Sequence, residues 1–322
     1  MKIIILTTFA DTLFRDALRK QLDEAGEVTT FPEAKPLSEL KHLFSTEDNK
    51  ILAIDPRFGG WTVSGTTGAA SKEVNELIDS SKNLRAVCLQ TTSFSWIDTE
   101  HARQKGIPVT NVRGFSTTAV AEWATMMVLV LARNVPLIIV PLIIKGSLKQ
   151  VSVKPLGIEL TGKTAGVIGM GRIGTAIAAR LRGLEMTVQY WSKNSTNPLC
   201  RRVSLEDLMQ TSDVILPTVA ANQDTENLIT DQMIKSMRST AIFVSVVHPI
   251  YNHSLLLDLA SKGAIYGYGF ENAKPDFTTH EGNIWAGPEL AWFTDGSQAA
   301  NAKQWVETIV SAAKGQFPNR VN

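Results

Sequence analysis

The stretch that decides the fold is Ala165-Gly-Val-Ile-Gly-Met-Gly-Arg-Ile-Gly174, a short apolar segment that runs into three closely spaced glycines. In a turn between a strand and a helix, Gly169 permits the tight bend and Gly171 lets a pyrophosphate approach the backbone. Gly174 lets the helix pack close to the sheet, and the pyrophosphate lies at the positive end of the helix dipole. We therefore predict a dinucleotide-binding turn made of Gly169, Gly171, Arg172, Ile173 and Gly174.

Length and composition are those of an ordinary enzyme with two domains: 322 residues, 44% hydrophobic content and a formal net charge of +1. The near-neutral charge, with Lys and Arg scattered along the chain, argues against a nucleic-acid partner. The two cysteines and five histidines have no ligand spacing, so no metal site is expected. Because no disulfide framework is indicated, we expect a reducing, cytoplasmic setting.

Two apolar stretches imitate membrane segments. The first, at residues 1–6, is followed too soon by Asp11 and Arg15 for a signal peptide, and we interpret it as a buried strand. The second, at residues 124–144, contains Arg133 and Pro136, which interrupt the run of about 20 apolar residues that a membrane span needs. It predicts a buried helix, a break and a second apolar segment, covered either by a partner subunit or by its own domain.

Strand-like and helix-like segments alternate along both halves of the chain. The first series predicts strands at 3–7, 51–54, 86–90 and 109–111, with helices at 12–25 and 74–80. The second series predicts strands at 167–169, 188–191, 214–216, 242–246, 265–267 and 290–293. Capping-box spacing predicts that helices begin at Ser95 and at Ser204. The pattern indicates an α/β fold with two parallel sheets.

Further motifs cover nearly the whole chain: Asn111-Val-Arg-Gly-Phe-Ser-Thr-Thr-Ala-Val-Ala-Glu122, Gly157-Ile-Glu-Leu-Thr-Gly-Lys163, Asp213-Val-Ile, Thr225 and Ala241-Ile-Phe-Val-Ser245. In these motifs the chain resembles the D-isomer-specific 2-hydroxyacid dehydrogenases. The resemblance implies two Rossmann-like or flavodoxin-like domains with parallel sheets and an active-site cleft between them. It implies a substrate-binding, flavodoxin-like domain of residues 1–101 and 293–322, a dinucleotide-binding Rossmann domain of residues 102–292, and a homodimer.

The end of the second cofactor-domain strand bears on the choice of cofactor. A carboxylate there would bind the ribose 2′-hydroxyl of NAD, but the chain has Ser192, Lys193 and Asn194. A hydroxyl beside an ammonium suits a 2′-phosphate through charge-assisted hydrogen bonds, so we predict NADP(H), with NAD(H) as the alternative. Lys193 has the further alternative of being a solvated surface residue. The expected contacts also include Thr118, Val219, Thr225 and Val246, with Arg201 and Arg202 as outer contributors.

The chain departs from the family at the catalytic positions. Family members use an arginine to hold the substrate carboxylate, a histidine to exchange the proton, and an acid that orients the histidine. Here His248 stands at the place of the arginine and Glu289 at that of the histidine. Either Lys274 or Asp276 stands at the place of the acid, and Glu271 matches the aspartate that faces the nicotinamide side.

These exchanges bear on the substrate. Removal of a buried arginine partner costs about 2–5 kcal/mol of carboxylate binding. A like charge at Glu289 about 5 Å from a bound carboxylate would cost roughly 3 kcal/mol more at an effective dielectric of about 20. A simple 2-oxo acid in the usual family pose is therefore disfavoured. The favoured substrate is a neutral or cationic carbonyl compound, or a carboxylate held by Arg57 or Arg113 instead.

Two functions fit this set of residues. In the first, the chain is a nicotinamide-dependent reductase with His248 as proton donor and Glu289, Glu271 or Asp276 as the orienting carboxylate; His248 could instead pack beneath the nicotinamide. In the second, the chain is a catalytically degenerate dinucleotide-binding regulatory or scaffold protein. A hydrogen bond between His248 and a carboxylate would favour the enzyme.

Loops at the carboxyl ends of the first series of strands are expected to bind the substrate. Family members carry an S-x-G-x-D run in the loop at residues 91–98, where this chain has Ser93 and Ser95 in place of the glycine and the aspartate, with Phe94 adding aromatic bulk. Arg57 and Trp61 follow another strand of the same sheet. We predict that the substrate contacts Ser93, Phe94, Ser95, Arg57 and Trp61.

Overall fold

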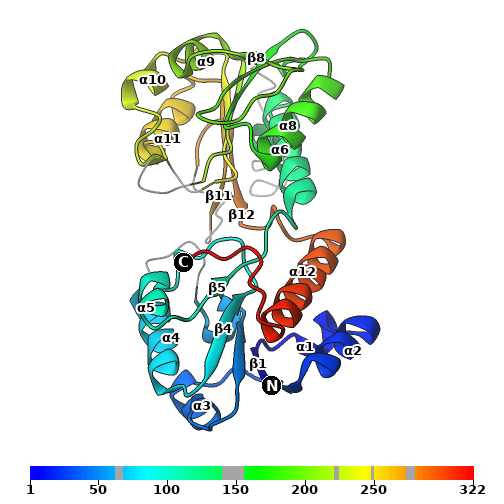
Figure 1. Ribbon diagram of the computed structural model, residues 1–322. Helices are drawn as coiled ribbons and strands as arrows, with labels where there is room; N and C mark the ends of the chain where they lie inside the picture. The colour runs from blue at the N-terminus through cyan, green and yellow to red at the C-terminus, as the bar shows by residue number, and fades with distance from the viewer. Residues whose placement is uncertain (62–67, 140–155, 221–224, 248–249, 273–279) are drawn as a thin grey trace. The chain divides into compact units, whose positions relative to one another are not determined.

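A computed structural model describes residues 1–61, 68–139, 156–220, 225–247, 250–272 and 280–322 (Figure 1). The chain forms two compact units: residues 1–115 and 294–322 make up unit 1, and residues 116–293 make up unit 2. The chain therefore enters unit 2 after Phe115, later than residue 101, and leaves it after Phe293. Each unit contains one parallel sheet, so the predicted α/β class with two parallel sheets is confirmed.

Unit 1 is built on a five-stranded sheet with the order β2-β1-β3-β4-β5. Every neighbouring pair is parallel, and the order is that of flavodoxin-like doubly wound folds. The strands are β1 (Lys2–Leu6), β2 (Glu27–Thr30), β3 (Lys50–Ile54), β4 (Leu84–Leu89) and β5 (Val109–Thr110). The helices are α1 (Ala10–Leu13), α2 (Asp16–Ala25), α3 (Leu37–Phe44), α4 (Gly68–Ser80), α5 (Thr99–Gln104) and α12 (Asp295–Ala313), with a 3-10 turn η1 (Pro56–Gly59).

Alternation along β1 explains why both faces of this sheet are covered. Ile4 and Leu6 pack into one apolar cluster with α3, α4 and α5, while Ile3 and Ile5 pack into another with α2 and α12. Figure 1 shows these two groups of helices on opposite sides of the sheet.

The carboxyl-terminal residues complete unit 1. Trp305 of α12 is fully buried and its Nε1 donates to the Cys88 carbonyl of β4 at 3.0 Å. At the edge strand β5, Asn322 Oδ1 accepts from the Val109 amide at 2.9 Å, and Asn322 Nδ2 donates to the Ile107 carbonyl at 2.8 Å. Residues from both ends of the chain therefore share one core.

Unit 2 is built on a seven-stranded sheet with the order β12-β11-β10-β9-β6-β7-β8. All neighbours are parallel, and the order is that of a Rossmann fold, with β6 as its first strand. The strands are β6 (Thr164–Ile168), β7 (Thr187–Trp191), β8 (Arg201–Arg202), β9 (Val214–Pro217), β10 (Ile242–Val244), β11 (Gly267–Asn272) and β12 (Ile284–Pro288).

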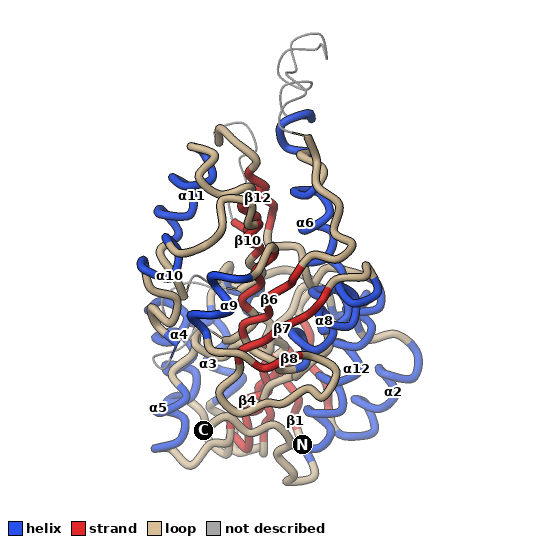
Figure 2. Tube along the Cα trace, turned by 90° about the horizontal axis from the view of Figure 1, so that it is seen from above, coloured by secondary structure: helices blue, strands red, loops and turns tan. Residues whose placement is uncertain are grey.

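Helices cover both faces of this sheet too, as Figure 2 shows from above. On one face, α6 (Thr117–Ala132) and α8 (Arg172–Gly183) contact each other and bury side chains such as Met127 and Ile177. On the other face, α9 (Leu205–Thr211), α10 (Asp231–Lys235) and α11 (His253–Ser261) pack over an aromatic cluster. The loops at the carboxyl edge are thereby held from both sides.

Several element predictions need correction. The strand predicted at 290–293 is wrong, because the last strand is β12 and the Leu290 and Ala291 amides donate to the Glu271 side chain instead. The helix predicted at 12–25 is divided into α1 and α2, with Asp16 at φ +46°. The start predicted at Ser95 is also wrong, because Asp98 caps α5, whereas the start predicted at Ser204 is confirmed.

The apolar stretch at 124–144 lies mostly in α6, and residues 135–139 are helical again. Residues 140–144 lie outside the described part. Whether a partner subunit or its own domain covers this second apolar segment therefore stays a prediction. Across the ranges given above, no helix combines the length and apolar character of a membrane span.

Candidate functional site

The carboxyl ends of the seven strands of unit 2 lie at the same edge of its sheet, because the strands are all parallel. In open α/β sheets, ligands bind at this carboxyl edge, where the strand order reverses. The reversal here falls between β6 and β9, which are neighbours in the sheet although β7 and β8 intervene in sequence. The described residues at this edge include Gly169, Gly171, Ser192, Thr218, Val219, Ser245, Val246, Glu271 and Glu289.

Two glycines of the turn after β6 are required by the protein itself. Gly169 has φ +99°, and a Cβ there would lie 2.6 Å from Val219 Cγ1. A Cβ on Gly174 would collide with the Gly169 carbonyl oxygen and lie 2.7 Å from Thr218 Oγ1. The Thr218 hydroxyl donates to the Gly169 carbonyl at 2.7 Å, so the side chain that follows β9 fixes the bend. Thr218 was missed in the sequence, although it directly follows the last residue of β9.

The middle glycine differs, because nothing in the protein requires it. Gly171 has φ −77°, which other residues adopt, and a Cβ there would have no atom within 4 Å. It precedes α8, whose first turn carries no side-chain cap. Backbone amides at such a helix start bind anions. The turn therefore fits a pyrophosphate, with exposed Arg172 and half-buried Ile173 following it.

At the end of β7 the predicted 2′-phosphate residues form a turn. Ser192 is buried, and its Oγ accepts from the Ser195 amide at 3.2 Å, while Lys193 and Asn194 are exposed. Arg202 Nη2 donates to the Ser192 carbonyl at 2.6 Å. The backbone of this turn therefore binds the Arg202 side chain next to the exposed Lys193.

The other predicted cofactor residues are spread around the same sheet. Thr118 is exposed in the first turn of α6, and Val246 is half-buried against the cluster under α6 and α8. Val219 lies over Gly169, and the Thr225 hydroxyl donates to the Ala220 carbonyl at 2.7 Å.

Glu271 lies near the end of β11, and its side chain contacts the backbone that follows β12. Its Oε1 accepts from the Leu290 amide at 2.9 Å and from the Ala291 amide at 2.8 Å. Burial raises the pKa of Glu271 to about 7; these two amides oppose the shift, and the charge of Glu289 adds to it. A carboxyl group with that pKa gains and loses a proton near neutral pH.

The remaining predicted catalytic residues are only partly visible. Glu289 is exposed and acts on Glu271 through its charge. His248 and Asp276 lie outside the described residues. The structure therefore brings together two of the predicted carboxylates and does not test the predicted hydrogen bond to His248.

In unit 1, Arg57 is paired with an acid that the sequence analysis missed. Asp55, directly after β3, is completely buried and accepts from Arg57 Nη2 at 2.7 Å and from Arg57 Nε at 3.0 Å. Asp55 also accepts from the Thr7 hydroxyl at 3.1 Å, and the guanidinium lies 4.5 Å from the ring centre of Phe9. The sequence contained only one sign of this pair, a single acidic residue directly after an apolar strand.

The other predicted substrate residues lie in two loops of unit 1. Trp96 is buried and its Nε1 donates to the Ser93 carbonyl at 2.9 Å, which shapes the loop after β4. The Ser93 and Ser95 hydroxyls are 3.3 Å apart, and Phe94 is exposed. Trp61 stacks on Trp96 with ring centres 6.0 Å apart.

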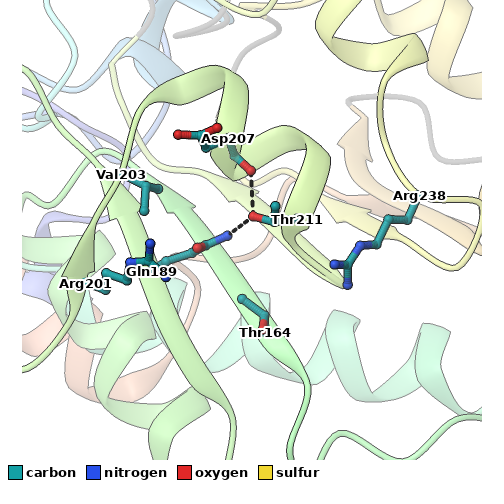
Figure 3. Close-up of a pocket in the computed structure, with 7 residues that line it drawn as sticks. All are labelled: Thr164, Gln189, Arg201, Val203, Asp207, Thr211 and Arg238. Atoms are coloured by element: carbon teal, nitrogen blue, oxygen red, sulfur yellow. Dashed lines mark hydrogen bonds between the residues drawn. The ribbon is translucent and has the colours of Figure 1, made fainter.

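A hollow of about 370 Å³ lies elsewhere on unit 2, as Figure 3 shows. One of its lining residues is Thr164, the first residue of β6. The glycine turn follows Ile168, the last residue of β6, so the hollow and the turn lie at opposite ends of this strand. The Gln189 side chain donates to Thr211 Oγ1 at 2.7 Å, and Thr211 donates to the Asp207 carbonyl at 2.6 Å. Arg201 lines this hollow, whereas Arg202, the other residue of β8, is not among its lining residues.

Comparison with known proteins agrees with this geometry. Residues 125–292, more than half of the chain, match the family model described as D-isomer specific 2-hydroxyacid dehydrogenase, NAD binding domain. The chain belongs to this family. Glyoxylate reductase of Pyrococcus horikoshii is 28% identical over 266 residues, which cover 76% of this chain and 77% of that protein.

Solved structures share the fold of this dehydrogenase family member over its whole length. A glyoxylate reductase from Paecilomyes thermophila superposes with a TM-score of 0.81 at 20% identity, covering 100% of this chain and 98% of that one. An acyclic imino acid reductase solved in complex with NADPH and D-Arg has a TM-score of 0.79 at 22% identity and covers 100% of both chains. The predicted family is confirmed, and the protein is a nicotinamide-dependent oxidoreductase that acts on CH–OH or C=O groups.

Proposed function

We propose that this dehydrogenase reduces a carbonyl substrate with NADPH, using a set of polar residues that differs from the usual arginine, acid and histidine of its family. The observation that carries the proposal is Glu271, a half-buried carboxyl group with a pKa of about 7 at the carboxyl edge of the Rossmann sheet. Its acidity suits proton exchange at neutral pH.

The chain's own groups would divide the work as follows. The turn from Gly169 to Gly171 and the first turn of α8 hold the pyrophosphate, and the bound nicotinamide supplies a hydride. Oε1 of Glu271 accepts hydrogen bonds from two backbone amides. Because these bonds occupy Oε1, the exchangeable proton is held on Oε2. His248 is the proton donor to the carbonyl oxygen in this proposal, and Glu271 is its orienting carboxylate.

Unit 1 is the substrate-binding domain in this proposal, and unit 2 is the cofactor domain. Arg57, Ser93, Phe94, Ser95 and Trp61 would contact the substrate. The geometry of Arg57 supports its part, because Asp55 and Phe9 hold the guanidinium in one place while its side chain stays 34% exposed. A planar guanidinium fixed in this way binds a carboxylate or another acceptor with little loss of side-chain entropy.

The preference for NADPH rests on charge at the turn after β7. The segment 191–202 contains no carboxylate, and it places exposed Lys193 next to a backbone that Arg202 contacts. Both cations would attract a 2′-phosphate. The fold itself accommodates NADPH in the imino acid reductase.

Fluorescence titration with NADPH and NADH tests this preference. Lys193→Ala is expected to raise the Kd for NADPH about fivefold to tenfold and to change the Kd for NADH less than twofold. Lys262→Ala is the matched control, because Lys262 is an exposed lysine paired with Asp258 on α11. Tighter binding of NADH than of NADPH to the unaltered protein would contradict the proposal.

Turnover is tested by following nicotinamide oxidation with a panel of neutral, cationic and anionic carbonyl compounds. We expect turnover of at least one non-2-oxo-acid carbonyl and a loss of about 100-fold or more in Glu271→Gln. Strong turnover of glyoxylate or pyruvate would show that a simple 2-oxo acid binds well in spite of the exchanged residues. Cofactor binding without turnover of any compound would favour a regulatory or scaffold role.

A further inference from the structure

The hollow of Figure 3 places a buried amide on a face of the unit 2 sheet that is largely apolar. Along β7, Val188 and Tyr190 pack into the cluster with α6 and α8, whereas the Gln189 side chain points the other way, toward α9. Gln189 is only 5% exposed. Burying an amide costs free energy unless it is hydrogen-bonded, so the partners of Gln189 indicate what the hollow can bind.

Two hydroxyl groups at the end of α9 fix the orientation of this amide. The Thr211 hydroxyl donates to the Asp207 carbonyl at 2.6 Å, and the Ser212 hydroxyl donates to the Leu208 carbonyl at 2.7 Å. Because both hydroxyl protons are used in this way, both oxygens accept from Gln189 Nε2, at 2.7 and 3.0 Å. Gln189 Oε1 accepts nothing from the described residues and stays accessible to solvent. A free acceptor on a buried side chain therefore faces the hollow.

Two charged side chains that line the hollow have opposite signs and do not pair. Arg201 of β8 is in register with Gln189 on the neighbouring strand, so its side chain leaves the same face of the sheet. Asp207 lies in α9 and is exposed. Within the described ranges, neither the Arg201 guanidinium nor the Asp207 carboxylate forms an ion pair or a hydrogen bond, although both residues line the hollow. In the view of Figure 3 both lie on one side, away from Arg238.

Arg238, on the other side, is only partly engaged. Its Nη1 donates to Asp213 Oδ1 at 3.1 Å, and Asp213 Oδ2 accepts from the Thr164 amide at 2.9 Å. Nε and Nη2 of Arg238 have no partner among the described residues, and the side chain is 46% exposed. Arg238 can therefore hold another anionic group while it keeps its bond to Asp213.

These groups together define the chemistry of a ligand. The two arginines match one carboxylate each. Asp207 and the free Gln189 oxygen accept hydrogen bonds and match an ammonium group. A simple carboxylic acid offers nothing to the two acceptors, and an amine offers nothing to the arginines. The volume of about 370 Å³ lies in the range of small-molecule sites.

We propose that this hollow binds an amino acid with a carboxylate side chain, such as glutamate. The α-carboxylate contacts Arg201, and the side-chain carboxylate contacts Arg238. The α-ammonium group contacts Asp207 and Gln189 Oε1. Because the hollow and the glycine turn lie at opposite ends of β6, the amino acid and the dinucleotide can be bound at the same time. Arg201 thereby belongs to the hollow and not to the cofactor.

Isothermal titration calorimetry of the whole protein tests the class of ligand. L-glutamate is expected to bind with a Kd of about 1 mM or lower. Glutarate lacks the ammonium group and L-glutamine lacks the second carboxylate, so each leaves a charged group of the hollow unmatched. Both are expected to bind about tenfold more weakly. Equal affinity for either compound, or no saturation by L-glutamate up to about 10 mM, would overturn the proposal.

Three arginine variants test the place. Arg201→Ala is expected to weaken L-glutamate binding about tenfold or more, and its exposed position should leave the fold intact. Arg182→Ala is the matched control, because it removes an exposed arginine of α8 outside the hollow. Arg57→Ala, in the proposed substrate site of unit 1, should also leave the Kd for L-glutamate unchanged. A loss of binding in Arg57→Ala, or none in Arg201→Ala, would overturn the proposal.

NMR of the side-chain amides gives an independent location. With NADPH at saturation, the Gln189 amide signals are expected to shift as L-glutamate is added, because Oε1 gains a donor. The Asn283 amide is the control, since it is buried elsewhere in unit 2 with Nδ2 bonded to the Leu131 carbonyl. Gln189 signals that stay unchanged at saturating L-glutamate would overturn the proposal.

The outcomes separate this site from the proposed function. Displacement of L-glutamate by NADPH would show one shared site and overturn the proposal of a second one. If the protein reduces no carbonyl compound, the proposed function fails, while binding of L-glutamate that depends on Arg201 still supports the hollow as a site.

Discussion

Asp55 in unit 1 is buried and Glu271 in unit 2 is half-buried, and both carboxylates lie at or just beyond the carboxyl end of a parallel strand. Asp55 contacts a guanidinium, a hydroxyl and the first amide of η1. Glu271 accepts two backbone amides and faces the negative charge of Glu289, and no cation pairs with it among the described residues. The comparison indicates that the partners of a carboxylate determine what it can do. Asp55, which pairs with a cation, fixes a loop, whereas Glu271, with a pKa of about 7, can exchange a proton near neutral pH.

The two sheet edges differ in the same way. The edge of unit 1 is filled by side chains that bond to one another, such as Thr7, Asp55 and Arg57. The edge of unit 2 is lined near β6 by glycines, with open space at Gly171. A filled edge and an open edge should respond differently to added or removed side-chain atoms.

The largest expected effect is that of an atom added where the unit 2 edge has no room. Gly174→Ala places a Cβ against the Gly169 carbonyl oxygen, which is backbone and cannot turn away. We expect a loss of about 3 kcal/mol or more in the free energy of unfolding, measured by denaturant titration. Gly296→Ala, in open space at the start of α12, should change it by less than about 0.5 kcal/mol. Equal stability of the two variants would contradict the packing described for the turn.

The next effect sharpens the difference between the two acids. Because the pKa of Glu271 is raised from 4.5 to about 7, the folded state binds its proton more tightly than the unfolded state. The stability from this group is complete below pH 4.5 and is lost as pH rises through 7, by roughly 3 kcal/mol.

Glu271→Gln should remove this part of the pH dependence, measured as unfolding free energy between pH 4.5 and pH 8. Glu281→Gln, at an exposed position of the same unit, should keep it. A stability profile in Glu271→Gln that still falls between those limits by the same amount would assign the effect to another group.

Gly171→Ala tests whether the open space belongs to a ligand. Its Cβ meets no protein atom, so the free energy of unfolding should stay within about 0.5 kcal/mol. The Kd for the dinucleotide should rise about 100-fold, because the methyl group occupies the place of the pyrophosphate. Gly183→Ala, which adds a methyl group in open space at the end of the same helix, should leave the Kd unchanged. Unchanged binding in Gly171→Ala would place the ligand elsewhere.

The smallest effect concerns the filled edge. Asp55→Asn leaves Arg57 without its charged partner and should lower the free energy of unfolding by about 2 kcal/mol, less than for a fully buried pair because Arg57 is partly exposed. Asp23→Asn breaks an exposed pair with Arg19 on α2 and should cost less than about 0.5 kcal/mol. Thermal unfolding of both variants provides the measurement, and equal losses would show that Asp55 is not a structural anchor.

Sequence alone predicted what depends on local chemistry. The apolar strands and the three glycines could be recognised because their residues suit only a few backbone conformations. Most strands of both sheets could be predicted in this way. Three strands were missed, β2, β8 and β12, and all three lie at a sheet edge. The first two have only two to four residues with polar sequences such as Arg201-Arg202. Their strand form comes from pairing with a neighbour, which no local pattern reports.

The site was harder to predict because its properties depend on contacts between distant residues. Burial raises the pKa of Glu271, and amides some 20 residues later oppose that shift. The same amides bond to Glu271 in place of the strand predicted at 290–293. Arg57 was recognised as a candidate, but its partner Asp55 was not, since one acid after a strand has no distinctive spacing. The hydrogen bonds that join His253, Tyr268 and Tyr251 likewise depend on the fold and leave no local pattern in the sequence.

The sharing of one core by both ends of the chain has a consequence for synthesis. The strands of unit 1 are complete by Thr110, yet Trp305 and Asn322 fill and close that unit. At about 5–20 residues per second, a ribosome needs roughly 10–35 s to make residues 116–293. During that delay only α1 and α2 cover the face of the sheet that α12 later completes, so the apolar residues that contact Trp305 in the finished unit remain exposed.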